Sequence, residues 1–497
     1  MKPLLLRAND IFKREDPTAT LSSLLYRIWN SATFMTWSSF ASRSLQIVVL
    51  LPLLLTRFTT AEISLWYLFR SIIELQRMGD LGFNVTFARV IAFALGGAQQ
   101  IKDHRIVEYT NQNTSPNWPL IERIYSTMHT IYLRLSLVAL LIGAIVGSWA
   151  LQKPISMTQD PTSAWIAWAI VIITTLITFQ GNTYSAYLQG TNNIALLRRW
   201  EAIFALVASI TSVSVVLLHG SLLNLIIVQQ SWWVINVFRD RWLCKQIQGG
   251  RFSSFQLTGI DTEVFKAVWP SAWRSGIGVF MSYGLVQISG ILYAQFGSTP
   301  GVASYLLALR LIDLIAEIAR APFYSKLPQL AQLRSKGRVT EQVQLARRGM
   351  SLAYWAFCIG FLLIGTFSTY LLKVIGSSTQ FVPLTLWALM GIAAFLERYG
   401  AMHIQLYSTT NHIIWHIANG ISGLIYIVTS LLLISTLGIY AFPIGLILGY
   451  LGFYVWYSAL HSYKAFHLKF WQFEPALSFV PFSCILFYAV VAFSLYI

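Results

Sequence analysis

Long apolar runs separated by short polar segments dominate the chain. A helix needs about 20 mostly apolar residues to cross a bilayer. The pattern contains thirteen such windows and predicts an all-α polytopic membrane protein with 12–14 transmembrane helices. The predicted spans are 31–55, 62–88, 123–150, 163–188, 195–218, 222–243, 265–295, 302–324, 349–375, 382–407, 412–436, 440–461 and 474–497.

The composition excludes several other classes of protein. Hydrophobic residues make up 56% of the chain and charged residues 11%, whereas soluble domains carry about 25% charged residues. An ordinary soluble enzyme, a coiled coil and a disordered chain are therefore excluded. The three cysteines, Cys244, Cys358 and Cys484, lie far apart, so we predict no disulfide framework, no metal site and no cofactor. The N-terminus does not resemble a cleavable signal, because Met1–Leu6 is too short an apolar run.

Basic residues are distributed unevenly between the two sides of the predicted membrane. The chain has 35 Lys and Arg against 19 Asp and Glu. With a cytoplasmic N-terminus, 25 basic residues fall on the inside and only Arg57, Lys153 and Lys373 on the outside. This positive-inside bias predicts a cytoplasmic N-terminus and explains the basic balance without nucleic acid as a partner.

Seven arginines and five acids are assigned to the interior of the predicted spans, and the other basic residues to loops and helix ends. Because a charge at the bilayer centre costs about 2.5–3.5 kcal/mol, these side chains are expected to face a cavity or a partner rather than lipid. The arginines are Arg43, Arg70, Arg77, Arg134, Arg274, Arg310 and Arg398, and the acids are Glu74, Asp80, Asp313, Glu317 and Glu397.

The loops leave little room for an enzyme. The outside loops are all short, which argues against a membrane-embedded glycan polymerase or ligase. The inside loops 97–120, 244–263 and 325–347 are too small for a nucleotide-binding domain, and neither the P-loop motif nor H-E-x-x-H occurs. We therefore predict that the chain is not an enzyme.

Two matches between distant segments indicate an internal duplication. Arg70 aligns with Arg310 at an offset of 240, and 189–194 aligns with 408–413 at an offset of 219. Two parallel six-helix bundles are the simplest explanation. The predicted division is a cytoplasmic segment 1–30, a first bundle 31–243, a cytoplasmic linker 244–264, a second bundle 265–465 and an extra C-terminal helix 466–497.

The aligned spans each carry a charged stripe. At about 100° per residue, Arg70, Glu74 and Arg77 share one helix face, as do Arg310, Asp313 and Glu317. One interpretation is a cavity wall between the bundles. The alternative is a pair of neutralising ion pairs, Arg70–Glu74 and Arg310–Asp313.

The seventh span carries a proline and two glycines beside an arginine. Pro270 is predicted to kink the helix, and Gly276 and Gly278 to let it bend, close to Arg274. A hinge beside a cavity suits a transporter that changes shape, and a static packing kink is the alternative.

Two short motifs resemble those of a known family. Met78–Asn84, with Arg89, resembles the "DLGF" stretch that follows the second span of Wzx-type polysaccharide repeat-unit flippases. Tyr187–Asn193, followed by Arg198–Glu201, resembles the "LQG-x-N" turn of the same family. These flippases belong to the multidrug/oligosaccharidyl-lipid/polysaccharide (MOP) exporter superfamily, and the resemblance covers roughly residues 30–465.

The resemblance implies a fold and a function. The fold would be a MATE-like V of two six-helix bundles, although such members usually have an even number of spans. The function would be transfer of undecaprenyl-pyrophosphate-linked oligosaccharide from the inner to the outer leaflet of the bacterial cytoplasmic membrane. The product would serve O-antigen, lipopolysaccharide or exopolysaccharide synthesis, with polymerase and assembly proteins as partners. A multidrug/cation antiporter of the same superfamily and a lipid II flippase are the alternatives.

Candidate site residues follow from the charges and the resemblance together. Arginine offers a planar fork of donors for phosphate, so four arginines are predicted to face the substrate. Proton or sodium coupling and gating are assigned to carboxylates, whereas Arg134 and the histidines His403, His412 and His416 are given structural roles. The cationic set is Arg43, Arg70, Arg274 and Arg310, and the coupling and gating set is Asp313, Glu317, Asp80 and Glu74.

Overall fold

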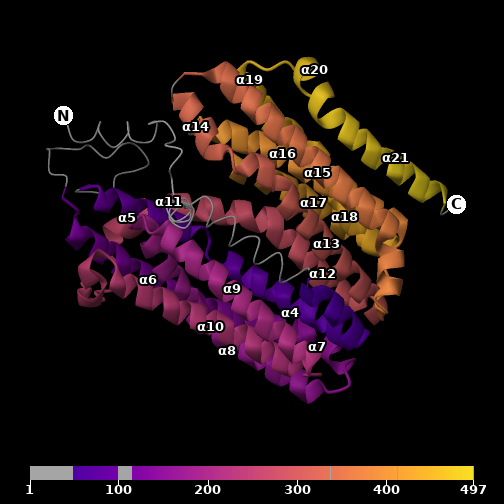
Figure 1. The fold of residues 1–497 in the computed structure, drawn as a ribbon, viewed down its shortest axis with the longest axis horizontal. Helices are drawn as coiled ribbons and strands as arrows, with labels where there is room; N and C mark the ends of the chain where they lie inside the picture. Colours follow the sequence, from indigo (N-terminus) through magenta and orange to yellow (C-terminus); the bar gives the residue numbers. More distant parts are fainter. Residues whose placement is uncertain (1–48, 99–114, 336, 411, 413, 496–497) are drawn as a thin grey trace, which may run out of the picture.

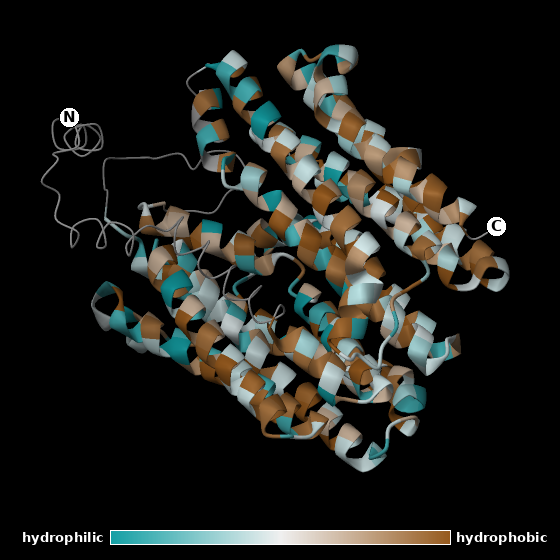
Figure 2. Cartoon of the chain, turned by 45° about the vertical axis from the view of Figure 1, so that its right-hand side comes forward, coloured by the Kyte–Doolittle hydropathy of each residue, from teal (hydrophilic) through white to brown (hydrophobic). Residues whose placement is uncertain are grey.

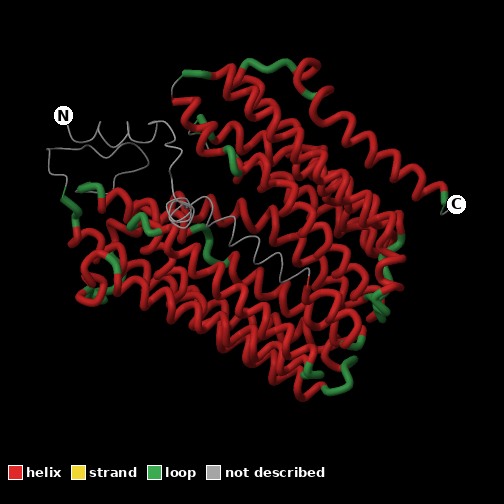
Figure 3. The backbone as a smooth tube through the Cα atoms, viewed as in Figure 1, coloured by secondary structure: helices red, strands yellow, loops and turns green. Residues whose placement is uncertain are grey.

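The computed structural model describes residues 49–98, 115–335, 337–410, 412 and 414–495. All regular structure in these residues is helical, and short loops join the helices (Figure 3). The main helices are α4 (Thr60–Met78), α5 (Phe83–Leu95), α6 (Trp118–Ile142), α7 (Ser148–Ser156), α8 (Pro161–Gly190), α9 (Ile194–Leu217), α10 (Leu222–Gln246), α11 (Thr262–Val279), α12 (Leu285–Phe296), α13 (Thr299–Tyr324), α14 (Leu327–Ser335), α15 (Val339–Val374), α16 (Leu384–Ser408), α17 (Trp415–Leu437), α18 (Ala441–Gly449), α19 (Val455–Phe466), α20 (Phe470–Phe473) and α21 (Val480–Ser494).

The prediction of an all-α polytopic membrane protein is confirmed. Eight helical stretches of the described chain are long and apolar enough to span a bilayer. One of them, Trp415–Phe466, has 52 residues and is long enough to cross twice. Helices α10, α13 and α16 are equally long but carry charged and polar residues, as expected for helices that face the protein interior. Most of the first predicted span, 31–55, lies outside the described residues, although 49–57 is helical.

The helices form two groups that meet along a line through the molecule (Figure 1). Helices α4–α10 lie on one side and α15–α21 on the other, with α11, α12 and α13 between them. The loops near residues 57, 153, 219 and 297 lie at one end of the molecule, which we call the Lys153 end. The loops near residues 80, 117 and 261 lie at the opposite end, the Arg123 end. The predicted topology would put the Lys153 end outside the cell.

Four helices that start at the Lys153 end begin with side-chain caps. Thr59, Asp160, Ser221 and Ser298 each accept a hydrogen bond from the backbone N–H three residues later. Such caps accept hydrogen bonds from backbone N–H groups that have no partner within the first helical turn. The hydrogen bonds from Ser163 also hold the pKa of Asp160 below its ordinary value. These caps fix where α4, α8, α10 and α13 begin.

Hydrophobic residues recur along the helices of both groups (Figure 2), and many large apolar residues are exposed. On α15, Ile359, Leu363, Phe367 and Leu371 are at least half exposed and recur every four residues. A soluble protein rarely leaves so long an apolar stripe open to water. These faces therefore suit contact with lipid, and the chain is a multi-pass membrane protein.

A single hydrophobic core joins the two groups at the Lys153 end. It contains Leu65 and Phe69 of α4, Ala294 of α12, and Leu306 and Leu307 of α13. All five side chains are nearly inaccessible. The first three turns of α4 and α13 are thus packed together, and this packing determines where the two helices meet.

The last helices are held to the second group by a buried acid. Glu474, between α20 and α21, accepts hydrogen bonds from Tyr463 (2.7 Å) and Ser478 (2.5 Å) and pairs with His403 of α16 at 3.1 Å. The side chains of His403 and Glu474 are both 0% exposed. The sequence analysis did not single out Glu474, because it stands at the start of a strongly apolar segment.

Candidate functional site

The predicted charged stripes lie on α4 and α13, which sit next to each other. Beyond the shared core at the Lys153 end, the charged side chains become accessible: Glu74 is 32% exposed, Arg77 47%, Asp313 43% and Glu317 48%. Charged groups in this position do not face lipid, so their accessibility indicates a polar opening between the groups toward the Arg123 end. We call Arg70, Glu74, Arg77, Arg310, Asp313 and Glu317 the central charged face.

Arg310 is only partly satisfied by its surroundings. Its Nη1 lies 3.5 Å from Asp313 Oδ2, a long contact. Its Nη2 is buried and has no hydrogen-bond partner among the described residues. A buried donor without an acceptor costs about 1–3 kcal/mol, and more when the group is charged. This guanidinium is therefore poised to bind an anionic acceptor.

Arg70 interacts electrostatically with Arg310. Its guanidinium lies 5.3 Å from the ring centre of Trp66, one turn earlier on α4. Arg70, Arg310 and Tyr67 are near enough to one another to interact electrostatically, and the buried Tyr67 hydroxyl has no partner among the described residues. Two like charges held together in a poorly solvated place favour a bound anion.

The ion pairs differ from those considered in the sequence analysis. Arg310–Asp313 is present, but Glu74 pairs with Arg77 at 3.7 Å and Glu317 pairs with Arg320. Of the two ion pairs predicted as the alternative to a cavity wall, Arg310–Asp313 is present, and Arg70–Glu74 is not found among the ion pairs of the described residues. Only Arg310 keeps an unpartnered, buried nitrogen on this face, within the described residues.

A second set of polar groups links α16 to the segments around Tyr283 and Tyr324. Arg398 Nη2 lies 3.5 Å from Glu397 Oε2, and these two charges interact with Tyr283 and Tyr324. Tyr283 is 44% exposed. The sequence analysis identified both charges but neither tyrosine, because aromatic residues are common throughout the chain.

The other predicted cations are placed differently. Arg43 lies outside the described residues. Arg274 is exposed on α11 and lies 5.8 Å from the ring centre of Trp273, its neighbour in sequence. Arg134 is exposed on α6. Arg70 and Arg310 interact electrostatically. Within the described residues, no hydrogen bond or ion pair joins Arg274 to either of them.

Asp80 caps a helix rather than facing the opening. Its carboxylate accepts the backbone N–H of Asn84 (3.2 Å) at the start of α5 and the hydroxyl of Tyr132 on α6. The turn before α5 has positive φ at Leu81 (51°) and Gly82 (72°). This geometry favours a structural tie between α5 and α6 over a gate.

The seventh span is less interrupted than its composition predicts. Helix α11 continues through Pro270 to Val279, and the chain widens into a π-helical turn only at Phe280–Gly284. A Cβ on Gly276 would lie 2.7 Å from the Leu81 Cα, and one on Gly278 would lie 3.0 Å from the Trp415 ring. Both glycines thus allow close packing of α11 against neighbouring segments, and their role as hinges stays a prediction.

The segment before α11 is anchored to α6. Arg123 donates to Asp261 and Glu263, each at 2.6 Å, and Ser126 accepts from the backbone of Thr258 and Gly259. The hydrogen bond from Arg123 lowers the pKa of Asp261 below its ordinary value. The start of α11 is therefore tied to the α4–α10 group at the Arg123 end.

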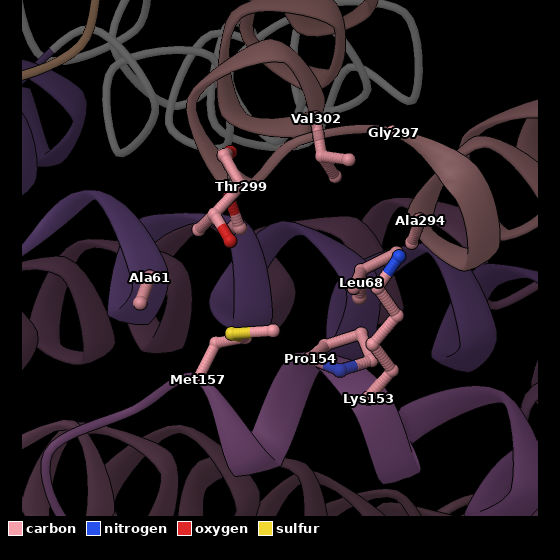
Figure 4. Close-up of a pocket in the computed structure, with 10 residues that line it drawn as sticks. Ala61, Leu68, Lys153, Pro154, Met157, Ala294, Gly297, Thr299 and Val302 are labelled. Atoms are coloured by element: carbon pink, nitrogen blue, oxygen red, sulfur yellow. Dashed lines mark hydrogen bonds between the residues drawn. The ribbon is translucent and has the colours of Figure 1, made fainter.

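Hydrogen bonds between the groups close the Lys153 end. Lys153 Nζ donates to the Gln295 carbonyl at 2.8 Å, and Gln295 Nε2 donates to the Ala150 carbonyl at 2.8 Å. The same end has a small pocket, with Lys153 and Pro154 on one side and Ala294 on the other (Figure 4). We call four contacts the latch: Lys153–Gln295, Gln295–Ala150, Ser64–Thr299 (3.3 Å) and Ser378–Leu55 (3.3 Å).

Removing the amine of the latch should open this end. In Lys153→Met, loss of a charge-assisted hydrogen bond is expected to raise the open population about tenfold, the effect of about 1.4 kcal/mol. The measurement is labelling of Val302→Cys, which lines the pocket and is buried, by a membrane-impermeant maleimide. Lys373→Met is the control, since Lys373 is an exposed base near the same end that takes no part in the latch. Equal labelling in both backgrounds would mean that the latch does not hold this end.

Within the described residues, no three His, Cys, Asp or Glu side chains gather closely enough to hold a metal ion. The central charged face pairs arginine with single carboxylates, an arrangement that suits organic anions better than metals.

Comparison with known proteins identifies the fold. The sequence matches no family model and no curated protein. Among solved structures, an inward-facing multidrug resistance MATE family transporter of the MOP superfamily is 10% identical, with 86% of this chain and 94% of that chain covered and a TM-score of 0.55. The lipid II flippase MurJ in an inward closed conformation is 11% identical, with 94% and 98% covered and a TM-score of 0.57. A mutant of the Vibrio cholerae MATE transporter VcmN is 14% identical, with 89% and 98% covered and a TM-score of 0.55.

These likenesses confirm the predicted MATE-like transporter fold. They cover 94–98% of each neighbour's chain. Identities of 10–14% show the fold alone. Function is therefore argued below from the residues of the central charged face.

Proposed function

We propose that this protein is a flippase for lipid-linked oligosaccharides whose lipid anchor carries a pyrophosphate. The observation that carries the proposal is the buried Nη2 of Arg310, which has no partner among the described residues and whose guanidinium interacts electrostatically with Arg70. A pyrophosphate supplies several acceptor oxygens and at least two negative charges, and it satisfies two arginines at once.

The accessible groups fit a headgroup that enters from the Arg123 end. The latch closes the Lys153 end, while Arg77, Asp313 and Glu317 are accessible from the opposite side. With the N-terminus in the cytoplasm of a bacterial cell, the substrate would bind from the inner leaflet. The lipid tail would stay in the bilayer while the headgroup moves between the helix groups.

Rearrangement of the two groups would then expose the headgroup on the other side. We propose that the groups move as bundles joined by the segment 244–264, in keeping with the alternating access of repeat-built transporters. The carboxylates Asp313 and Glu317 compete with substrate for Arg310 and Arg320, and proton or sodium binding at these acids would favour release. The resulting glycan would pass to polymerase and assembly proteins.

Two other functions share the fold. A cation antiporter needs an acidic cavity, and the exposed acids Glu74, Asp313 and Glu317 favour it. A lipid II flippase is favoured by the coverage of MurJ, which reaches 94% of this chain. The antiporter leaves the open guanidinium of Arg310 unexplained, whereas lipid II itself carries a pyrophosphate that this guanidinium could bind.

A leaflet assay in a strain that lacks the chain distinguishes the three. In this strain, radiolabelled lipid-linked repeat units should accumulate in the inner leaflet. When the wild-type chain is supplied, they should appear in the outer leaflet. If the distribution is unchanged while drug or ion tolerance falls, the protein is an antiporter. If the chain instead replaces an essential lipid II flippase, that substrate is the correct one.

A further inference from the structure

The α4–α10 side of the opening carries two tryptophans and an amide beside the central charged face. Trp66 Nε1 of α4 lies 3.4 Å from Gln229 Oε1 of α10, in donor geometry. One α10 turn further on, the Trp233 ring centre lies 4.2 Å from the Arg77 guanidinium carbon. We call Trp66, Arg77, Gln229 and Trp233 the α4–α10 wall.

Several hydrogen-bond donors of this wall have no good acceptor within the protein. Gln229 Nε2 is buried and has no partner among the described residues. Arg77 is 47% exposed, and its 3.7 Å contact with Glu74 is too long to count as a good hydrogen bond. The wall therefore offers donors from an amide and a guanidinium beside the partly exposed Trp233 ring, whereas the Trp66 ring is 4% exposed and belongs to the hydrophobic core.

This combination fits a sugar better than it fits the lipid anchor. A pyranose ring has a C–H face that packs on an indole, and hydroxyl groups that both donate and accept. An organic cation would use the indole and Glu74 but leave the Gln229 and Arg77 donors unsatisfied. We propose that the α4–α10 wall is a subsite for the first sugar residue of the transported headgroup; the inference rests on the proposed function.

The position of the wall along α4 supports this assignment. Arg77 lies seven residues beyond Arg70, which corresponds to about 10 Å along the helix. Arg70 lies near Arg310, where we place the pyrophosphate. A sugar attached to that pyrophosphate, pointing toward the Arg123 end, reaches the level of Arg77 and Trp233.

Two soluble probes separate sugar recognition from phosphate recognition. Farnesyl pyrophosphate and N-acetylglucosaminyl farnesyl pyrophosphate would be titrated against the full chain in nanodiscs, with affinity measured by thermophoresis. Wild type should bind N-acetylglucosaminyl farnesyl pyrophosphate about tenfold more tightly than farnesyl pyrophosphate. Trp233→Leu should remove this difference and leave the affinity for farnesyl pyrophosphate unchanged, and Trp233→Phe should restore part of it.

Trp232 supplies the matched control. It is the neighbouring residue on α10, but its indole donates to Thr211 of α9 at 2.8 Å and so faces away from the wall. Trp232→Leu should keep the tenfold preference, which also shows that loss of a tryptophan on α10 is tolerated. Arg310→Gln should weaken both probes equally.

The outcomes distinguish the two proposals. Equal binding of both probes by wild type, or a preference that survives Trp233→Leu, overturns the sugar subsite and leaves the flippase intact. Failure of wild type to bind either probe overturns the pyrophosphate site and the subsite with it.

Discussion

Arg310→Gln is expected to reduce transport of lipid-linked units to about one hundredth of the wild-type rate or less. The substitution keeps a polar but shorter side chain and removes the charge and the donor fork. Truncating one partner of a buried, hydrogen-bonded charge pair costs about 2–5 kcal/mol, and 2.7 kcal/mol corresponds to about a hundredfold. The readout is the initial rate of leaflet transfer in inverted membrane vesicles.

Two further variants test the reason for this loss. Arg310→Lys keeps the charge but offers no planar fork, so an intermediate loss of about tenfold is expected. Arg134→Gln removes an arginine from the exposed face of α6 and should leave the rate unchanged. If Arg310→Gln transports normally at equal abundance, pyrophosphate does not bind at this guanidinium, and its open nitrogen has a structural origin.

Glu474→Leu should destabilise the protein more than any surface change. It leaves His403, Tyr463 and Ser478 without their common acceptor in a site where His403 is 0% exposed. Breaking a buried pair from one side costs about 3–5 kcal/mol, because the remaining groups stay desolvated. An apparent melting temperature about 5–10 °C lower is expected in detergent, measured by tryptophan fluorescence.

An exposed ion pair provides the comparison. Glu263 lies 2.6 Å from Arg123, closer than Glu474 lies to His403, but its side chain is 82% exposed. Glu263→Gln should therefore change the melting temperature little, since exposed pairs contribute about 0–1 kcal/mol. In the double variant His403→Leu with Glu474→Leu, the buried imidazole is no longer left without its acceptor, and much of the loss should be recovered. If the Glu474→Leu protein is as stable as wild type, the His403–Glu474 pair does not hold α21 in place.

The sequence predicts the architecture because membrane helices obey strong and local rules. Apolar length specifies the spans, and helical periodicity correctly puts Glu74 and Arg77, or Arg310 and Asp313, within reach of each other. Contacts between distant segments follow no such rule. The Lys153–Gln295 hydrogen bond and the His403–Glu474 pair join residues 142 and 71 positions apart, and nothing in either local sequence announces the partner.

The residues of the candidate site also differ in how well the sequence predicts them. Charged residues in apolar spans are conspicuous, so Arg70 and Arg310 could be chosen from the sequence. Trp233 and Tyr283 could not, since tryptophan and tyrosine also occur at lipid interfaces and in cores. Pro270 lies inside α11, which continues past it to Val279, and the predicted kink at this residue stays a prediction.

One consequence of α13 concerns mechanics. This helix runs unbroken from Thr299 to Tyr324, 26 residues or about 39 Å, with a latch residue at its first turn and Arg310 near its middle. The tight packing of Leu306 and Leu307 against α4 lies between these two points, so a rotation of α13 in the proposed transport cycle would pivot there. A stiff rod that pivots moves its ends in opposite directions. Pulling the charged half of α13 toward α4 around a ligand would then move Thr299 away from Ser64, with no need for a flexible relay between the two sites.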